Sequence, residues 1–108
     1  MAIVSKGYGA NDLIHTLFNL AKAGVIGDAA LLNIRCIKTL KDFNTAEEAL
    51  RYCNETYCSQ VTIKRKYAKI YSITLHLHQI IDFNLNDKSL VINTKNGPSN
   101  ITKVTIKF

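Results

Sequence analysis

The chain is poor in proline and has no long apolar run. Pro98 is its single proline, and no Pro- or Ser-rich stretch or internal repeat divides it. A length of 108 residues is typical of one domain, so we predict a single domain over residues 1–108. No segment approaches the roughly 18 apolar residues of a membrane span. The first residues also lack the apolar stretch of a secretory signal, so we expect a cytoplasmic protein without membrane contact.

Cysteine is scarce, and its count is odd. Cys36, Cys53 and Cys58 are unevenly spaced, whereas a secreted disulfide framework usually has an even number of cysteines. We therefore expect a reducing compartment in which the three thiols act as small apolar side chains.

Common catalytic motifs are missing as well. There is no Ser/His/Asp arrangement or paired carboxylate site, and the two glycines of residues 5–9 do not have P-loop spacing. His15, His76 and His78 remain, and histidines paired with a lysine suit metal-free RNA cleavage. A small basic ribonuclease is thus the least favoured alternative. We predict a protein that is not an enzyme and has no catalytic residues and no cofactor.

A metal site is a further alternative. His76 and His78 are two residues apart on a predicted strand and share one face. Cys53 and Cys58 would complete a nitrogen and sulfur ligand set, but this spacing matches no common zinc module. Cysteines five residues apart on a helix also point roughly 140° apart. We therefore predict that no metal is bound.

The clearest positive signal is a change of hydrophobic period. Up to about residue 58, apolar residues recur at steps of three and four, which predicts helices over 11–26, 28–40 and from Thr45 to about 58. Asn11 or Asp12 is the expected cap of the first helix, and Thr45 with Glu48 forms a capping box for the third. The second helix is apolar nearly all round, which is typical of a central helix or of a dimer interface.

From Val61 to Leu85 the apolar residues fall mostly on odd positions, which predicts strands buried on one face. The stretch is too long for one strand, so we expect a break near residues 64–69 or a bulge near Gln79. Turns at residues 86–88 and 96–99 then lead into two more strands, with Ile3-Val4 as a weaker candidate for an edge strand.

Together these patterns predict an α+β fold. Three N-terminal helices would pack on one face of a C-terminal antiparallel sheet of three to five strands, as a two-layer sandwich. The helical half covers about residues 11–58 and the sheet half about residues 61–108.

The charge divides in the same way. Residues 1–60 hold six bases and six acids, whereas residues 61–108 hold eight bases and two acids, so the sheet half carries the whole formal charge of +6. If the helices cover one face of the sheet, the basic side chains that share the other face are Lys64, Lys66, His76, His78, Lys103 and Lys107. A basic face rich in hydroxyl groups suits contact with phosphates, so these six residues form the predicted nucleic-acid-binding site. Tyr67 and Tyr71 occupy odd positions, which are predicted to face the core, so this site would lack aromatic rings for stacking.

Lysine is also the ordinary residue of a solvated sheet face, so two readings stay open. The leading hypothesis is a small non-enzymatic protein that binds nucleic acid as a homodimer. The alternative is a modulator or inhibitor whose basic face meets an acidic surface on a host protein. Ile, Asn, Lys, Tyr and Phe account for 43 of the 108 residues, which is typical of an A/T-rich genome, such as those of many phages, viruses and low-GC bacteria. Of these sources, a virus or phage is the one we favour.

Overall fold

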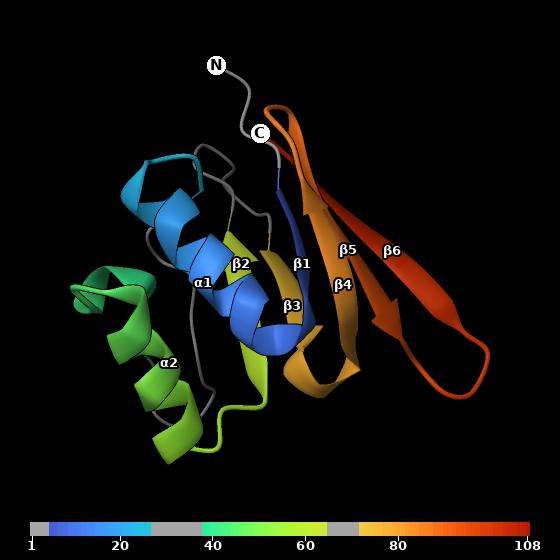
Figure 1. Cartoon of the computed structure of the whole chain (residues 1–108), viewed down its shortest axis with the longest axis horizontal. Coiled ribbons are helices and arrows are strands. Elements are labelled where there is room, and N and C mark those ends of the chain that lie inside the picture. Colours follow the sequence, from blue (N-terminus) through green and yellow to red (C-terminus); the bar gives the residue numbers. More distant parts are fainter. Residues whose placement is uncertain (1–4, 27–37, 65–71) are drawn as a thin grey trace.

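The computed structural model describes residues 5–26, 38–64 and 72–108 (Figure 1). In chain order its elements are β1 (Ser5–Tyr8), α1 (Gly9–Lys22), the 3-10 helix η1 (Leu40–Asp42), α2 (Ala46–Glu55), β2 (Gln60–Lys64), β3 (Ser72–His76), the 3-10 helix η2 (Leu77–Gln79), β4 (Ile80–Leu85), β5 (Ser89–Lys95) and β6 (Ile101–Lys107).

The described strands form two antiparallel sheets. One sheet has the order β1-β4-β5-β6, and β2 pairs with β3 alone. α1 packs on β1 and β4 and against α2. β5 and β6 lie on the side of the molecule farthest from the two helices (Figure 1). The predicted α+β class and antiparallel pairing are confirmed, but the single C-terminal sheet is wrong. β2 and β3 form a separate hairpin, and the larger sheet takes an edge strand from the N-terminal segment.

Two α-helices, not three, occur in the described residues. Most of the predicted helix 28–40 falls on residues 27–37, outside that part of the chain. Its predicted end is wrong, because Thr39 is extended and a 3-10 turn follows it. The Asp42 carboxylate closes this turn by accepting a hydrogen bond from the backbone N–H of Thr39 at 2.8 Å, and that bond lowers the pKa of Asp42.

α1 begins two residues before the predicted start. Gly9 adopts φ +76°, a conformation that costs a glycine little and lets the chain turn directly from β1 into the helix. Asp12 does not cap α1 from outside. It lies in the first turn, and its carboxylate accepts a hydrogen bond from the backbone N–H of Tyr8 at 3.1 Å. The predicted apolar face is buried at Leu13, Ile14, Leu17 and Phe18.

α2 confirms the sequence signal at its start and contradicts it at its end. The Thr45 hydroxyl accepts a hydrogen bond from the N–H of Glu48 at 3.2 Å, and the Glu48 carboxylate reaches back to the N–H of Asn44. The sequence places Ala49, Leu50, Cys53 and Tyr57 on one apolar stripe of this helix, but Tyr57 is 91% exposed. The helix stops at Glu55 before the stripe reaches Tyr57.

Replacing Thr45 with alanine should lower the free energy of unfolding by about 1 kcal/mol, because one N–H at the start of α2 loses its acceptor. Thr45→Ser keeps the hydroxyl and should stay close to the parent. Urea denaturation of both variants measures the difference. Equal losses in the two variants would contradict the capping role.

The strands confirm most of the predicted alternation. β2 ends at Lys64 and β3 begins at Ser72, so most of the break predicted near residues 64–69 lies outside the described residues. The predicted bulge is present, since the register of β4 against β5 shifts between Ile80 and Asp82. Because of this bulge, Ile80 is buried while Ile81, predicted to lie inside, is 38% exposed. The predicted turns also form. The Asn86 side chain accepts two backbone N–H groups, and Gly97 adopts φ +87°.

One cluster of buried apolar side chains joins the helices to both sheets. Its fully buried members include Leu13 and Leu17 of α1, Val61 of β2, and Phe83 and Ile92 of the larger sheet. Residues from both halves of the sequence therefore share a core. In the part of the chain that the structure covers, no helix has the length and apolar character needed to cross a bilayer.

Candidate functional site

The six residues of the predicted basic site do not share one sheet. Lys64 is the last residue of β2, His76 ends β3, and His78 lies in η2. Lys103 and Lys107 belong to β6, in the other sheet. Lys66 lies outside the described residues. The sequence analysis assumed that all these residues lie on one sheet, whereas the strand pairing places those on described strands in two different sheets.

A different candidate for the binding surface is the side of the larger sheet that faces away from α1. We call it the outer face and define it by strand register and exposure. Its members are Lys6, Tyr8, Asp82, Asn84, Ser89, Val91, Asn93, Lys95, Ile101, Lys103, Thr105 and Lys107. Gly7 and Phe83 face the opposite side, toward the core, where Phe83 is 1% exposed. None of the outer-face residues is buried.

The outer face is strongly basic. Its four lysines, Lys6, Lys95, Lys103 and Lys107, are all exposed, and Asp82 is its single acid. The side-chain amide of Asn93 donates a hydrogen bond to the Asp82 carboxylate at 2.5 Å. The outer face thus has four positively charged groups and one carboxylate, and this carboxylate already has a hydrogen-bond partner.

An aromatic ring lies among these charges. Tyr8 is 63% exposed, and the Lys6 ammonium is 5.5 Å from the centroid of its ring. The register places Tyr8 across from Asp82, which pairs in turn with Asn93, opposite Lys103. A single row across the four strands therefore presents a ring at one edge of the sheet and an ammonium at the other.

The sequence prediction missed Lys6 and Tyr8 because it did not extend a strand to Ser5–Tyr8. This segment holds Gly7 and has no run of alternating apolar residues, so β propensity gives little signal there. The expected edge strand at Ile3-Val4 was the nearest indication, and these two residues lie outside the described part of the chain.

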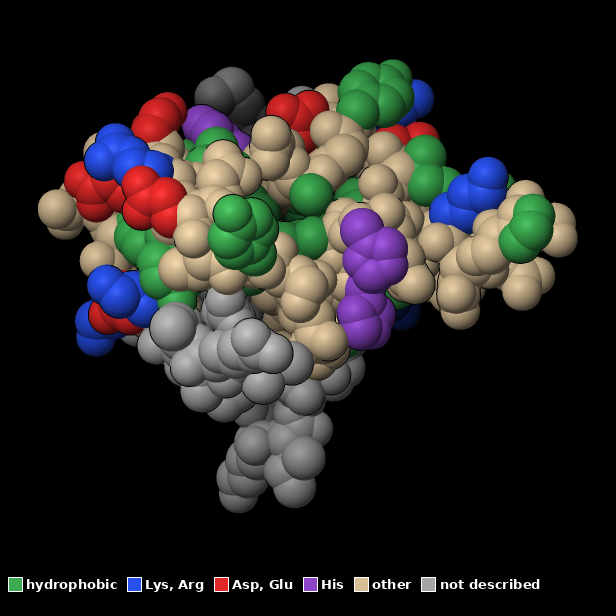
Figure 2. Space-filling view, turned by 90° about the horizontal axis from the view of Figure 1, so that it is seen from below, with side chains coloured by type: hydrophobic (Ala, Val, Ile, Leu, Met, Phe, Trp, Pro, Cys, Tyr) green, Lys and Arg blue, Asp and Glu red, His purple; other side chains and the backbone are tan. Residues whose placement is uncertain are grey.

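The β2–β3 hairpin presents a polar surface of a different kind. The hydroxyl groups of Thr62 and Thr74 are hydrogen bonded to each other across the hairpin at 3.1 Å, and Gln60 contacts His76 at 3.5 Å. The rings of His76 and His78 are 6.1 Å apart, and Figure 2 shows two histidines side by side on this surface, with the third histidine apart from them. The structure therefore brings His76 and His78 near each other but does not bring the three histidines together.

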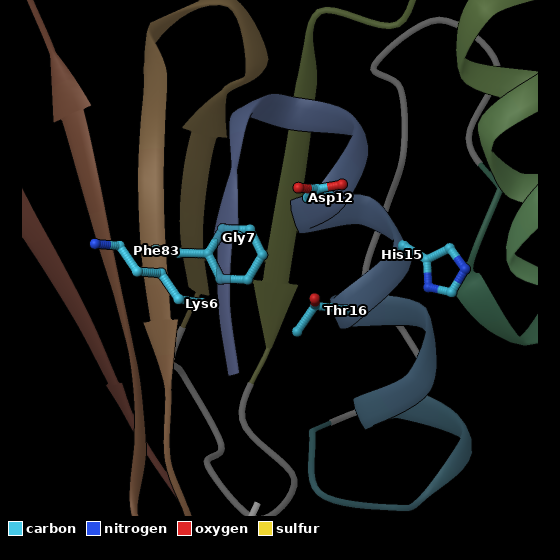
Figure 3. Close-up of a pocket in the computed structure, with 6 residues that line it drawn as sticks. All are labelled: Lys6, Gly7, Asp12, His15, Thr16 and Phe83. Atoms are coloured by element: carbon cyan, nitrogen blue, oxygen red, sulfur yellow. The ribbon is translucent and has the colours of Figure 1, made fainter. Parts of the chain in front are cut away.

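A pocket of about 370 Å³ lies between β1 and α1 (Figure 3). Its lining residues are Lys6, Gly7, Asp12, His15, Thr16 and Phe83. Figure 3 shows Lys6 on β1 and His15 on α1, with their side chains pointing away from each other. His15 instead approaches Glu47 of α2, with 3.7 Å between Nε2 and the carboxylate. The pocket thus does not bring the Lys6 ammonium and the His15 ring together.

The cysteines depart from the predicted geometry. Cys53 and Cys58 do not diverge by 140°, because α2 ends at Glu55 and the chain turns back. Cys36 lies outside the described residues. Among the residues that are described, no three His, Cys, Asp or Glu side chains come together in a group able to hold a metal ion.

The chain was compared with protein-family models, with curated proteins and with solved structures. None of the three comparisons found a match. Its function is therefore inferred from the outer face and its chemistry.

Proposed function

We propose that this protein binds nucleic acid, with a preference for single strands, through the outer face of its four-stranded sheet. The observation that carries this proposal is that four exposed lysines and the exposed ring of Tyr8 share the outer face, with the Lys6 ammonium close to that ring. Proteins that bind single strands without reading sequence combine positive charge along the backbone with aromatic rings on which bases stack. The protein acts by binding and catalyses no reaction.

The spacing of the lysines fits an extended polyanion. Lys103 and Lys107 are four residues apart on β6, which is roughly 14 Å along a strand. Lys6 lies across the sheet on β1, and the exposed Thr105 hydroxyl lies between the two β6 lysines. Lysines supply charge to phosphates and hydroxyl groups supply neutral donors, while neither reads the base sequence.

An acidic surface on a host protein would meet the same face with similar electrostatics. Ile101 is 65% exposed among the lysines, and an exposed apolar residue of this kind is common in protein interfaces. This alternative predicts little affinity for any nucleic acid, so the same binding assay separates the two functions. The predicted homodimer stays a proposal, because most of the helix predicted over 28–40, which motivated it, lies outside the described residues.

The test is fluorescence anisotropy with a short labelled single strand and the matching duplex at about 0.15 M salt, where distant charges are screened. We expect the single strand to bind more tightly than the duplex and the affinity to fall as salt rises. If neither probe binds below roughly 100 µM, the outer face is not a nucleic-acid site, since this is the weak end of non-specific binding. The ratio of absorbance at 260 and 280 nm gives a second readout, because five tyrosines and no tryptophan absorb little at 280 nm.

Replacing Tyr8 with alanine should weaken single-strand binding by about 1–3 kcal/mol, because one base loses its stacking partner. Tyr8→Phe keeps the ring and should bind like the parent. Duplex binding should change less in both variants, since the bases of a duplex are already stacked. An equal loss in Tyr8→Ala and Tyr8→Phe would contradict stacking and point to the hydroxyl.

A further inference from the structure

The two helices end in the same backbone arrangement. At the end of α1 the N–H of Val25 donates to the carbonyl of Leu20 at 2.9 Å, and Gly24 between them adopts φ +76°. At the end of α2 the N–H of Cys58 donates to the carbonyl of Cys53, also at 2.9 Å. Tyr57 holds the position of the glycine, with φ +52°. Both ends show the long-range hydrogen bond and the left-handed residue of the Schellman motif.

This motif brings two side chains together. The residues that share the hydrogen bond usually make an apolar contact, and Leu20 and Val25 hold these positions in α1. In α2 the same positions hold Cys53 and Cys58, whose thiols are hydrogen bonded to each other. Cys53 is buried against the core, while Cys58 is only half-buried. The turn of the chain at Tyr57 thus makes a dithiol from two cysteines that a continuous helix would separate.

We propose that Cys53 and Cys58 form a redox-active dithiol site, which a small-molecule disulfide closes into an intramolecular disulfide bond.

The two thiols have different reactivities. The hydrogen bond from the Cys53 thiol lowers the pKa of Cys58 to about 7, although burial opposes this shift. The same hydrogen bond, together with burial, raises the pKa of Cys53. Near neutral pH, a substantial share of Cys58 is therefore thiolate, and thiolates are the species that attack disulfides. Cys58 is also the more exposed of the two residues.

The reaction proceeds in two exchanges. In the first, the Cys58 thiolate attacks one sulfur of the small disulfide, whose S–S bond breaks and releases a thiolate. In the second, the Cys53 sulfur attacks Cys58 in this mixed disulfide, and its proton goes to the second departing thiolate. The two cysteines lose two electrons and two protons in total, and the small disulfide is reduced to two thiols.

Trypsin offers a direct assay on the unmodified chain. Cleavage after Arg51 and Lys64 releases residues 52–64, which contain Cys53 and Cys58 but not Cys36. The folded protein is incubated with oxidised glutathione, quenched in acid, alkylated under denaturing conditions and digested. We expect this peptide to lose the mass of two hydrogens and to carry no alkyl group.

Single alanine variants test the order of the exchanges. Cys53→Ala should stop at the mixed disulfide, so the peptide gains one glutathione. Cys58→Ala should react about tenfold more slowly, because the buried Cys53 is a poor thiolate. The alkylation rate of Cys58 should show a midpoint near pH 7 in the parent. In Cys53→Ala the midpoint should rise toward about 8.5, since the hydrogen bond is lost.

Tyr57→Gly provides a matched control for the backbone. Glycine adopts the left-handed conformation without strain, so the dithiol should close at the parent rate. A parent peptide that gains two glutathiones, or that does not react while the protein is folded, would overturn the proposal. Either result would show that the pair only fills space at the end of α2.

Discussion

Replacing Lys103 and Lys107 with glutamate should weaken the binding of a short single strand about a hundredfold, because two partners of phosphate groups become repulsive. Both side chains are exposed on the outer face of β6, so the fold should lose no more than about 0.5 kcal/mol for each change. The salt dependence should flatten by roughly 0.7 units for each lost contact with a single strand. Anisotropy titrations at several salt concentrations measure both quantities.

A matched pair of lysines on the helical side controls for net charge. Lys22 and Lys38 are exposed and lie near aromatic rings of the helical layer, with Lys22 over Phe18 and Lys38 near Phe43. Their replacement by glutamate changes the total charge by the same amount. Binding should fall much less than in the outer-face variant, because these charges act only over a distance that salt screens. Equal losses in the two variants would show that net charge, not the outer face, drives binding.

A third pair tests the residues that sequence alone favoured. Lys64 and Lys66 belong to the segment that ends β2 and follows it. If their replacement by glutamate lowers affinity more than the change at Lys103 and Lys107, the binding surface is on the β2–β3 side of the molecule. The outer-face proposal predicts the opposite order.

Replacing Gly7 with alanine should lower the free energy of unfolding by about 1–3 kcal/mol or more, because it adds a carbon to a filled core. Gly7 pairs with Phe83 across β1 and β4, and the ring of Phe83 covers it. An added Cβ would lie within 3.0 Å of three ring atoms. Phe83 is 1% exposed and belongs to the core cluster, so a shift of its ring would disturb packed neighbours. Thermal and urea denaturation measure the loss.

Two further variants separate the steric cause from the others. Gly7→Ala combined with Phe83→Leu should lose less stability than the sum of the two single changes, since the smaller side chain relieves the contact. Gly97→Ala is the control for glycine itself. Nothing lies within 4 Å of a Cβ added there, so its cost should be only the roughly 1–2 kcal/mol of a left-handed alanine. Additive losses at Gly7 and Phe83 would contradict the steric cause.

The sequence predicted well the features that depend on residues close together in the chain. The N-terminal cap of α2 at Thr45 and the turn at Asn86 each form through hydrogen bonds within four residues. The apolar face of α1 and the alternation of β2, in which Val61 and Ile63 are buried, also follow from local periodicity. The end of α2 was missed because the left-handed conformation of Tyr57 gives no signal, since glycine is the residue usually found there.

The candidate site depended on contacts that no local pattern encodes. Ser5 pairs with Leu85, so an N-terminal segment adds Lys6 and Tyr8 to a sheet built from the C-terminal half. The charge count by halves had assigned Lys6 to the neutral part of the chain. The separate pairing of β2 with β3 also removed His76 from the sheet that carries Lys103.

The sequence by itself determined the α+β class, the antiparallel pairing, the excess of positive charge and the parity of most strands. Only the tertiary structure decided which strands are neighbours and which charges share a face. The period of the apolar residues predicts which face of a strand packs on the core, and this prediction needs only the residues of that strand. The choice of neighbour depends on how distant segments close loops and fill a common core. The pairing of β1 with β4 is one such long-range contact, and the resulting strand order places the lysines of β1 and β6 on one surface.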